Sequence, residues 1–225
     1  VPELTEATVQ RSSRIVGMMG AEPFMRALDQ GAEVILAARA SDAASWAGCA
    51  MHNGLPAAPS WYAGKMLECG TAAALPKGHD CILVTVRADH VEVEPANPAR
   101  KCTPFSVANH ALHENASPTI HEEPGGLLDA TDCTFTALSD RAVKVAGMRW
   151  TTRPYDIKLE GAEMVGYRAI TICGTRDPIL ISQIDSYLQT VREDIEGRAS
   201  NFGVSPERYQ LVFHVYGKDG VMGAG

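Results

Sequence analysis

The sequence predicts an α/β protein, with parallel βαβ units in the first third and a mixed sheet with a long helix in the rest. Two continuous apolar runs of strand length stand at residues 14–20 and 32–39, and each is followed by a segment with helical spacing. A third observation is the long series of apolar residues at helical spacing in residues 177–200. Strands that alternate with helices are typical of parallel sheets with crossover helices.

The first predicted unit is a strand, a helix and a second strand. RIVGMMG at residues 14–20 predicts a buried strand. AEPFMRALDQG at residues 21–31 predicts a helix whose apolar face carries Phe24 and which stops at Gly31. AEVILAAR at residues 32–39 predicts a strand that is buried on both faces.

Two further helices are predicted before the pattern changes. Residues 41–54 read as a helix with Ser41 or Asp42 as its N-cap. Residues 60–70 read as a shorter helix for which Ser60 is a candidate cap.

The rest of the chain mixes strand, loop and helix signals. LPKGHD interrupts the pattern near residues 75 to 80, so we expect an α/β portion, 1–75, and a mixed α+β portion, 80–225, which could also form one continuous domain. The expected strands lie in 81–95, 142–150, 167–174 and 208–217, the expected helices in 103–115 and 177–200, and the expected loop and turn region is 117–135.

Composition narrows the classes of function. The 225 residues are 45% hydrophobic and 21% charged with a formal charge of −7, and they contain no basic run, so no nucleic-acid partner is expected. No apolar run approaches the roughly 20 residues that cross a bilayer, so no membrane contact is expected either. Six cysteines without a CxxC pair and the lack of a signal peptide predict reduced thiols and a cytoplasmic location. The chain begins without Met and ends in YGKDGVMGAG, so we expect a fragment or a trimmed product.

The first candidate site residues follow the predicted strands of the first third. Ligands of open α/β sheets bind outside the carboxyl ends of the strands, where Arg39 and Asp42 would stand. Arg39 could bind a carboxylate or phosphate in a bidentate fork, and Asp42 could act as a base. Glu22 follows the other strand at the same end. The alternative is structural: Asp42 caps a helix and pairs with Arg39, and Glu22 is a first-turn acid.

A second candidate is the pair Glu68 and Cys69, which precedes Gly70 in the stretch KMLECGTAAA. Because a helix C-terminus disfavours a thiolate, Glu68 is the stronger candidate for a general base. An ordinary helix end with a glycine stop is the alternative.

Four further candidates lie in the second half. Lys158 and Glu160 occupy alternating positions before two glycines, Arg176 follows a predicted strand, and Tyr216 lies at the end of another. Asp177, which follows Arg176, needs no role beyond that of an N-cap before Pro178.

Histidines raise a third possibility, a metal-dependent hydrolase. His110 and His113 are three residues apart on a predicted helix, and His121 follows in the expected loop. Solvated or capping histidines are the default, and no metal site is predicted. No nucleotide, phosphate-loop or calcium motif is present, so the sequence names no cofactor.

Several stretches together resemble the acyclic terpene utilisation (AtuA-like) protein family. They are GAEPFMRALDQGAEVILAARASDAA, LECG, VEPANPARKCTPFSVANHAL, GGLLDATDCTF, YDIKLEGAEMVGYRAITICGTRDPILISQID and VYGKDGVMG. The resemblance covers nearly the whole chain and implies that this is the central portion of proteins about twice as long. One departure is Ala38, which stands where the family pattern has a glycine before Arg39.

The resemblance implies catabolism of acyl or carboxylic compounds, and it carries over no catalytic residues. Our first hypothesis is an enzyme of acyclic terpenoid or branched acyl/carboxylate catabolism that moves a proton next to a carbonyl, as a hydratase, lyase or isomerase does. Its expected partners are a carboxylate or acyl-CoA substrate and a second copy of the chain or another subunit. Arg39 or Arg176 would bind the anionic group, and Glu68 or Lys158 would move the proton. The alternative is a non-catalytic scaffold or regulatory subunit, for which we expect an exposed apolar patch in place of a pocket.

Overall fold

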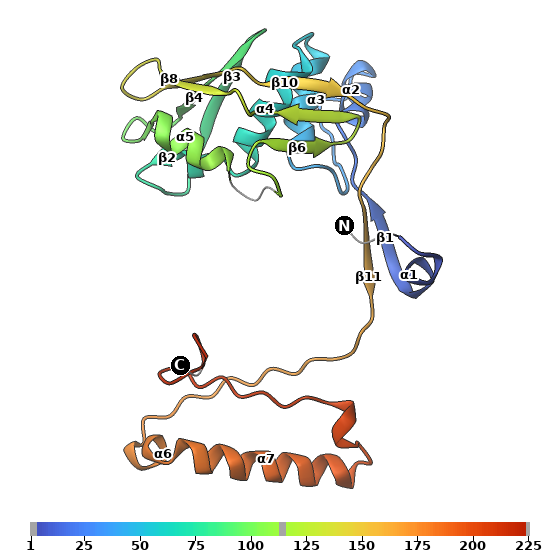
Figure 1. Ribbon diagram of the computed structural model, residues 1–225, viewed down its shortest axis with the longest axis vertical. Coiled ribbons are helices and arrows are strands. Elements are labelled where there is room, and N and C mark those ends of the chain that lie inside the picture. Colours follow the sequence, from blue (N-terminus) through green and yellow to red (C-terminus); the bar gives the residue numbers. More distant parts are fainter. Residues whose placement is uncertain (1–3, 113–115, 224–225) are drawn as a thin grey trace. The chain divides into compact units, whose positions relative to one another are not determined.

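The computed structural model describes residues 4–112 and 116–223 (Figure 1). The chain divides into two compact units, residues 1–165 and 166–225. The predicted boundary near residues 75 to 80 stays a prediction. Within the described residues, no helix has the length and apolar character needed to cross a membrane.

Three helices form one side of the core of the first unit: α2 (Glu22–Asp29), α3 (Ala44–His52) and α4 (Ala57–Glu68). α2 packs on α3 and α3 packs on α4. The last of these helices is the most buried, and its Trp61, Tyr62 and Met66 are almost fully enclosed. At Gly64 the backbone carbonyl of Ala43 lies where a Cβ atom would stand, so only glycine lets the segment before α3 approach α4 this closely.

Antiparallel sheets form the other side of the core. In the four-stranded sheet, of order β3-β4-β9-β8, Val91, Val93, Val143 and Val145 face inward and are fully buried. A three-stranded sheet of order β10-β7-β6 packs near α4 (Figure 1). The bounds of these strands are β3 (Ile82–Val86), β4 (His90–Pro95), β9 (Val143–Ala146), β8 (Thr134–Ala137), β10 (Arg149–Thr152), β7 (Gly126–Asp129) and β6 (Ile120–Glu123).

Smaller elements complete the first unit. The two-stranded pairs are β1 (Ser12–Gly17) with β11 (Leu159–Glu163) and β2 (Ala74–Leu75) with β5 (Lys101–Cys102); the remaining helices are α1 (Glu6–Arg11), η1 (Gly70–Ala73) and α5 (Pro104–Ala111).

Two stacked indole rings join the three-stranded sheet to α4. Trp150 of β10 lies on Trp61 of α4 with ring centroids 5.5 Å apart and an interplanar angle of 3°. The edge of the Trp150 ring occupies the place of a Cβ at Gly126, the first residue of β7. The stack and the glycine together fix where the β6–β7 hairpin sits on the helix.

The mixed α/β class is confirmed, but the expected parallel βαβ arrangement is not supported. β1 is mostly exposed and pairs antiparallel with β11, and residues 32–39 form no strand. Val34 and Leu36 are 88% and 100% exposed, so the predicted burial on both faces is wrong. Antiparallel pairing is slightly more stable per residue than parallel pairing, and β11 offers β1 such a partner. An apolar run cannot indicate which partner it will have.

In the described part of the chain, one isolated parallel bridge joins Met19 to Ala40. It joins the chain just after β1 to the chain just before α3. The carboxyl ends of the two predicted strands therefore lie side by side even though the strands themselves do not.

The loop expected at residues 117–135 is wrong in part, because it contains β6, β7 and the start of β8. Glu123 pairs with Gly126, so Pro124 and Gly125 form a two-residue turn, and Gly125 has a φ of +82°. The proline and glycine therefore mark a tight hairpin turn and not a long loop. Such a turn needs a residue with positive φ, and Gly125 supplies it.

The starts of two helices also differ from expectation. The N-cap of α3 is Ala43, whose methyl side chain cannot make a capping bond. The predicted caps have other partners, since the Ser41 hydroxyl donates to Glu123 and the Asp42 carboxylate accepts from Arg39. Ser60 lies inside α4, where its hydroxyl donates to the carbonyl of Pro56 over 2.7 Å.

The second unit contains α6 (Pro178–Ser182), the long helix α7 (Ile184–Asn201) and the short η2 (Pro206–Arg208). Asp177 is the N-cap, as predicted, and its Oδ1 accepts the backbone N–H of Ile179 at 2.8 Å. The strands predicted at 167–174 and 208–217 are not formed, because residues 167–174 and 209–215 have no regular secondary structure, Arg208 ends η2 and residues 216–217 lie in a turn. A strand needs a neighbour to bond with, and within this unit the two segments do not pair.

Candidate functional site

The bridge between Met19 and Ala40 sets the position of the site. The N–H of Met19 donates to the carbonyl of Arg39 at 3.1 Å, and the N–H of Ser41 donates to the carbonyl of Met19 at 2.9 Å. Glu22 and Asp42 thus follow two neighbouring chain segments at one edge, which is the relation that the strand-end argument expected.

The centre of the site is a hydrogen bond between Ser41 and Glu123. Ser41 Oγ donates to Glu123 Oε2 at 2.5 Å, and Glu123 is the last residue of β6 before the hairpin turn. Burial raises the pKa of Glu123 to about 7, against the opposing effect of the Ser41 hydrogen bond. The carboxylate of Glu68 raises this pKa further, and the ammonium of Lys65 lowers it. Glu123 therefore gains and loses its proton near neutral pH.

A buried ion pair on α4 lies next to this carboxyl group. Lys65 and Glu68 are one helical turn apart, their side chains are 10% and 11% exposed, and Lys65 Nζ donates to Glu68 Oε1. Glu68 is thus more than the end of a helix, because it faces inward and has a buried cation beside it. Cys69 follows as the C-cap of α4.

His121 stands two residues before Glu123 on β6 and is buried. Burial lowers its pKa to about 4, and the nearby ammonium of Lys65 adds to this effect. Its imidazole is therefore neutral at the pH at which Glu123 exchanges its proton.

Four of the predicted site residues form one network of ion pairs, which we call the rim network: Arg39, Asp42, Lys158 and Glu160. The guanidinium of Arg39 binds Glu160 in a bidentate fork, with Nε to Oε2 and Nη2 to Oε1 both at 3.0 Å. Asp42 Oδ1 lies 3.4 Å from Arg39 Nη1, and Lys158 Nζ lies 3.4 Å from Glu160 Oε1. The hydrogen bond from Arg39 holds the pKa of Glu160 below its usual value. The network joins β11 to the loop that carries Ser41.

Arg176 and Tyr216 are not part of this network. Both belong to the second unit, and Tyr216 is 79% exposed.

The histidines form no metal site among the described residues. His110 Nε2 lies 3.2 Å from the carbonyl of Met66, and His113 falls outside the described residues. No group of three or more His, Cys, Asp or Glu side chains in the described ranges is placed to hold a metal ion.

Two central residues, Lys65 and Glu123, were missed by reasoning from the sequence. The stretch HEEPGG carried a usable signal, because an acid directly before a two-residue Pro-Gly turn ends a hairpin strand. The spacing of three between Lys65 and Glu68 was also visible, since residues three apart share a helix face.

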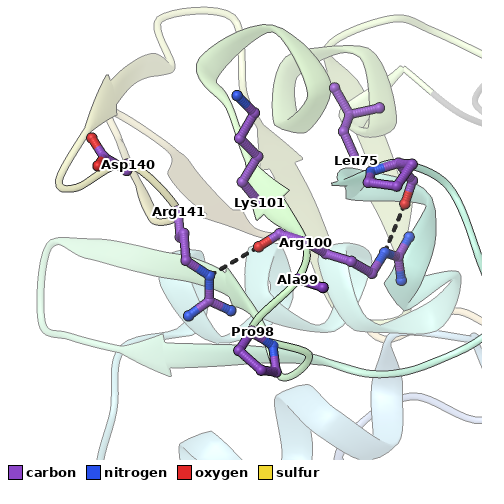
Figure 2. Close-up of a pocket in the computed structure, with 8 residues that line it drawn as sticks. Leu75, Pro98, Ala99, Arg100, Lys101, Asp140 and Arg141 are labelled. Carbon is purple, nitrogen blue, oxygen red and sulfur yellow. Dashed lines mark hydrogen bonds between the residues drawn. The ribbon is translucent and has the colours of Figure 1, made fainter.

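An open depression of about 490 Å³ lies elsewhere in the first unit (Figure 2). Arg100 donates to the carbonyl of Pro76 at 2.7 Å, and Arg141 donates to the carbonyl of Arg100 at 2.9 Å. Both guanidinium groups thus hold backbone segments together, and the depression contains none of the acid–base residues. Its lining is Leu75, Pro76, Pro98, Ala99, Arg100, Lys101, Asp140 and Arg141.

The fold and the site define a mixed α/β protein with a cluster of acid–base groups at the meeting point of two chain segments and a hairpin. The model of the acyclic terpene utilisation family protein AtuA matches residues 4–76 of this chain, so this segment is similar to the family that the sequence resembles. The matched segment carries Glu22, Ser41, Lys65 and Glu68. No curated protein and no solved structure matches the chain.

Proposed function

We propose that the protein is an enzyme of acyclic terpenoid or branched acyl/carboxylate catabolism that transfers protons next to a carbonyl group, as a hydratase, lyase or isomerase does. The family match supports the metabolic setting. The observation that carries the chemistry is the pair of Glu123, whose pKa is raised to about 7, and Glu68, whose carboxylate is paired with Lys65. Carboxyl groups in such different environments can serve as acid and base in one reaction.

Each group has a role in the elimination direction. The carboxylate of Glu68 accepts the proton from the carbon next to the carbonyl, and the ammonium of Lys65 stabilises the negative charge that develops on the carbonyl oxygen. Protonated Glu123 donates its proton to the leaving hydroxyl group, which departs as water while the carbon–carbon double bond forms. Hydration is the same sequence in reverse.

The rim network supplies the proposed binding role of Arg39. The guanidinium already binds a carboxylate, that of Glu160, in the geometry that a substrate carboxylate or CoA phosphate would need. Asp42 and Lys158 would adjust the charge of this anchor. The proposed roles of Cys69 in catalysis and of Arg176 and Tyr216 in substrate binding remain predictions.

A second candidate function is a scaffold or regulatory subunit. The exposed apolar side chains of Val34 and Leu36 favour it, because such side chains in an unpaired segment are suited to contact a partner chain or a second copy. In that case the acid–base groups would serve stability alone.

The test is proton exchange in deuterated water. Branched acyl-CoA thioesters and the free acids are incubated with the protein, and NMR follows loss of the proton next to the carbonyl. We expect exchange that Glu123→Gln and Glu68→Gln each slow at least about a hundredfold. Glu122→Gln is the matched control, since Glu122 is the neighbouring, 82% exposed acid of β6. Exchange at the uncatalysed rate with every probe, or equal rates in all variants, would favour the scaffold.

A further inference from the structure

Glu160 occupies the side of Arg39 that an anionic substrate would need. Its two carboxylate oxygens accept from Nε and Nη2 of Arg39, both at 3.0 Å. Nη1 of the same guanidinium donates to Asp42 Oδ1 at 3.4 Å. Arginine binds carboxylates and phosphates through two parallel N–H groups. A substrate anion can therefore use the Nε–Nη2 edge of Arg39 only if the carboxylate of Glu160 leaves it.

The room for a ligand anion is the room that the Glu160 carboxylate takes up now. The ion pair is open to solvent, since the side chains of Arg39 and Glu160 are 38% and 33% exposed. Exposed ion pairs contribute little to stability, because water and salt weaken them. An anion from solution can thus reach Arg39 and exchange with Glu160 at small cost, and no buried cavity has to open for it.

Lys158 offers Glu160 a second cation. Lys158 Nζ lies 3.4 Å from Glu160 Oε1, the same oxygen that accepts from Arg39 Nη2. When Glu160 leaves Arg39, its carboxylate can stay beside this ammonium while the ligand anion pairs with the guanidinium. The exchange therefore leaves no charge of the rim network without a partner.

Arg39 is held in place next to the proposed acid. Its carbonyl accepts the N–H of Met19 at 3.1 Å, and two residues later the Ser41 hydroxyl donates to Glu123. Glu160 stands on β11, which pairs with β1, and both strands are mostly exposed. Segments with few buried contacts open at the lowest cost in free energy. The guanidinium thus stays with the site, and the carboxylate is the part that can leave.

We propose that Glu160 is an internal stand-in for the anionic group of the substrate, and that it keeps Arg39 occupied until an incoming carboxylate or phosphate displaces it. The proposal rests on the binding role proposed above for Arg39 and adds a regulation of the same site. The apparent affinity for the ligand falls in proportion to the fraction of molecules in which Arg39 is free. An exposed ion pair is strong enough to lower this affinity about twofold to sixfold.

The experiment measures anion affinity of the full chain by calorimetry at low salt. The probes are 3-methylbutyrate for a carboxylate, coenzyme A for a phosphate, and 3-methylbutyramide as the uncharged counterpart. We expect Glu160→Gln to raise the affinity for one or both anions about twofold to sixfold and to leave that for the amide unchanged. The anion that responds names the group that Arg39 binds.

The matched control is Glu163→Gln. Glu163 is the other acid of β11, its Oε1 lies 2.9 Å from Arg11 Nε, and its side chain is 37% exposed. This variant removes the same charge from the same strand, so it separates the contact with Arg39 from the net charge. We expect it to leave the affinity for both anions unchanged. Arg39→Gln combined with Glu160→Gln should lose the gain.

The outcomes separate the stand-in from the proposed function. Unchanged or lower affinity in Glu160→Gln, the same gain in Glu163→Gln, or a gain that persists without Arg39 overturns the stand-in. Absence of anion binding in every protein overturns it too, because Arg39 is then no anion site. None of these results decides the acid–base chemistry, which proton exchange in deuterated water tests. Conversely, a gain in Glu160→Gln without proton exchange supports the stand-in and refutes the chemistry.

Discussion

Ser41 Oγ donates to Glu123 Oε2 at 2.5 Å, although the two residues are 82 positions apart in the sequence. This bond ties the loop before α3 to the β6–β7 hairpin. It also stabilises the ionised form of Glu123 and so opposes the effect of burial on its pKa.

Ser41→Ala should therefore raise the pKa of Glu123 further above 7. The measurement is a pH titration of the side-chain carboxyl carbon by NMR in protein labelled at glutamate, with Glu123→Gln to assign the resonance. Ser13→Ala, a change at an exposed serine of β1, should leave the titration as it is. A titration of Glu123 that does not move in Ser41→Ala would contradict the assigned hydrogen bond.

Glu123 and His121 should have opposite effects on the pH dependence of stability. Glu123 has a folded pKa of about 7, above the usual 4.5, so its contribution is full below about pH 4.5 and is lost as the pH rises through 7. His121 has a folded pKa of about 4, below the usual 6.5, so its contribution is full above about pH 6.5 and is lost as the pH falls through 4. Between pH 4.5 and 6.5 the two slopes oppose each other.

Denaturation by urea over pH 4 to 7.5 checks this balance. Glu123→Gln should leave a stability that rises with pH up to about 6.5, and His121→Gln should leave one that falls up to about pH 7, each by about 2 kcal/mol once partial solvent exposure is allowed for. The double variant should be nearly flat by comparison. Parallel curves for wild type and both single variants would refute the two shifts.

Lys65→Met should destabilise the protein by about 3 to 5 kcal/mol, because the carboxylate of Glu68 would stay buried without that ammonium beside it. Replacing both residues, as Lys65→Met with Glu68→Met, should recover most of the loss. Chemical denaturation of the three variants measures both effects. Equal losses in the single and double variants would mean that the aliphatic stem of Lys65 matters and its charge does not.

Gly126→Ala should destabilise the first unit by at least about 1 to 3 kcal/mol, since the added methyl group would overlap the Trp150 ring. Gly174→Ala is the matched control, because nothing lies within 4 Å of a Cβ there and its φ is not positive. Thermal and urea unfolding compare the two. A neutral Gly126→Ala would indicate that the indole stack can shift without loss.

Local signals in the sequence predicted helices better than strand pairing. The helix stop at Gly31, which has a φ of +81°, and the N-cap at Asp177 were predicted correctly, because they depend on a few adjacent residues. The pairing of β1 with β11 was not predicted, since those strands lie nearly the whole first unit apart in sequence. A strand's partner depends on the remainder of the fold, which no short pattern contains.

In the candidate site, too, reasoning from the sequence placed some residues correctly and missed those that depend on contacts between distant parts of the chain. Placing Glu22 and Asp42 at one edge followed from a general property of α/β chains and agrees with the Met19–Ala40 bridge. Glu123 was missed because its raised pKa results from burial, and because its hydrogen-bond partner Ser41 is far away in sequence. A sequence shows that an acid precedes a turn, but it does not show what that turn packs against.

The parallel stack of Trp61 and Trp150 gives the protein an internal optical reporter. Two indoles at this distance should produce a coupled near-ultraviolet circular dichroism signal and an emission that differs from that of the more exposed Trp46. One ring belongs to the helix that carries Lys65 and Glu68, and the other lies against the hairpin that carries Glu123. Any event that separates the acid from the base must therefore change that signal, so the assembly of the site can be followed without a label and before any substrate is known.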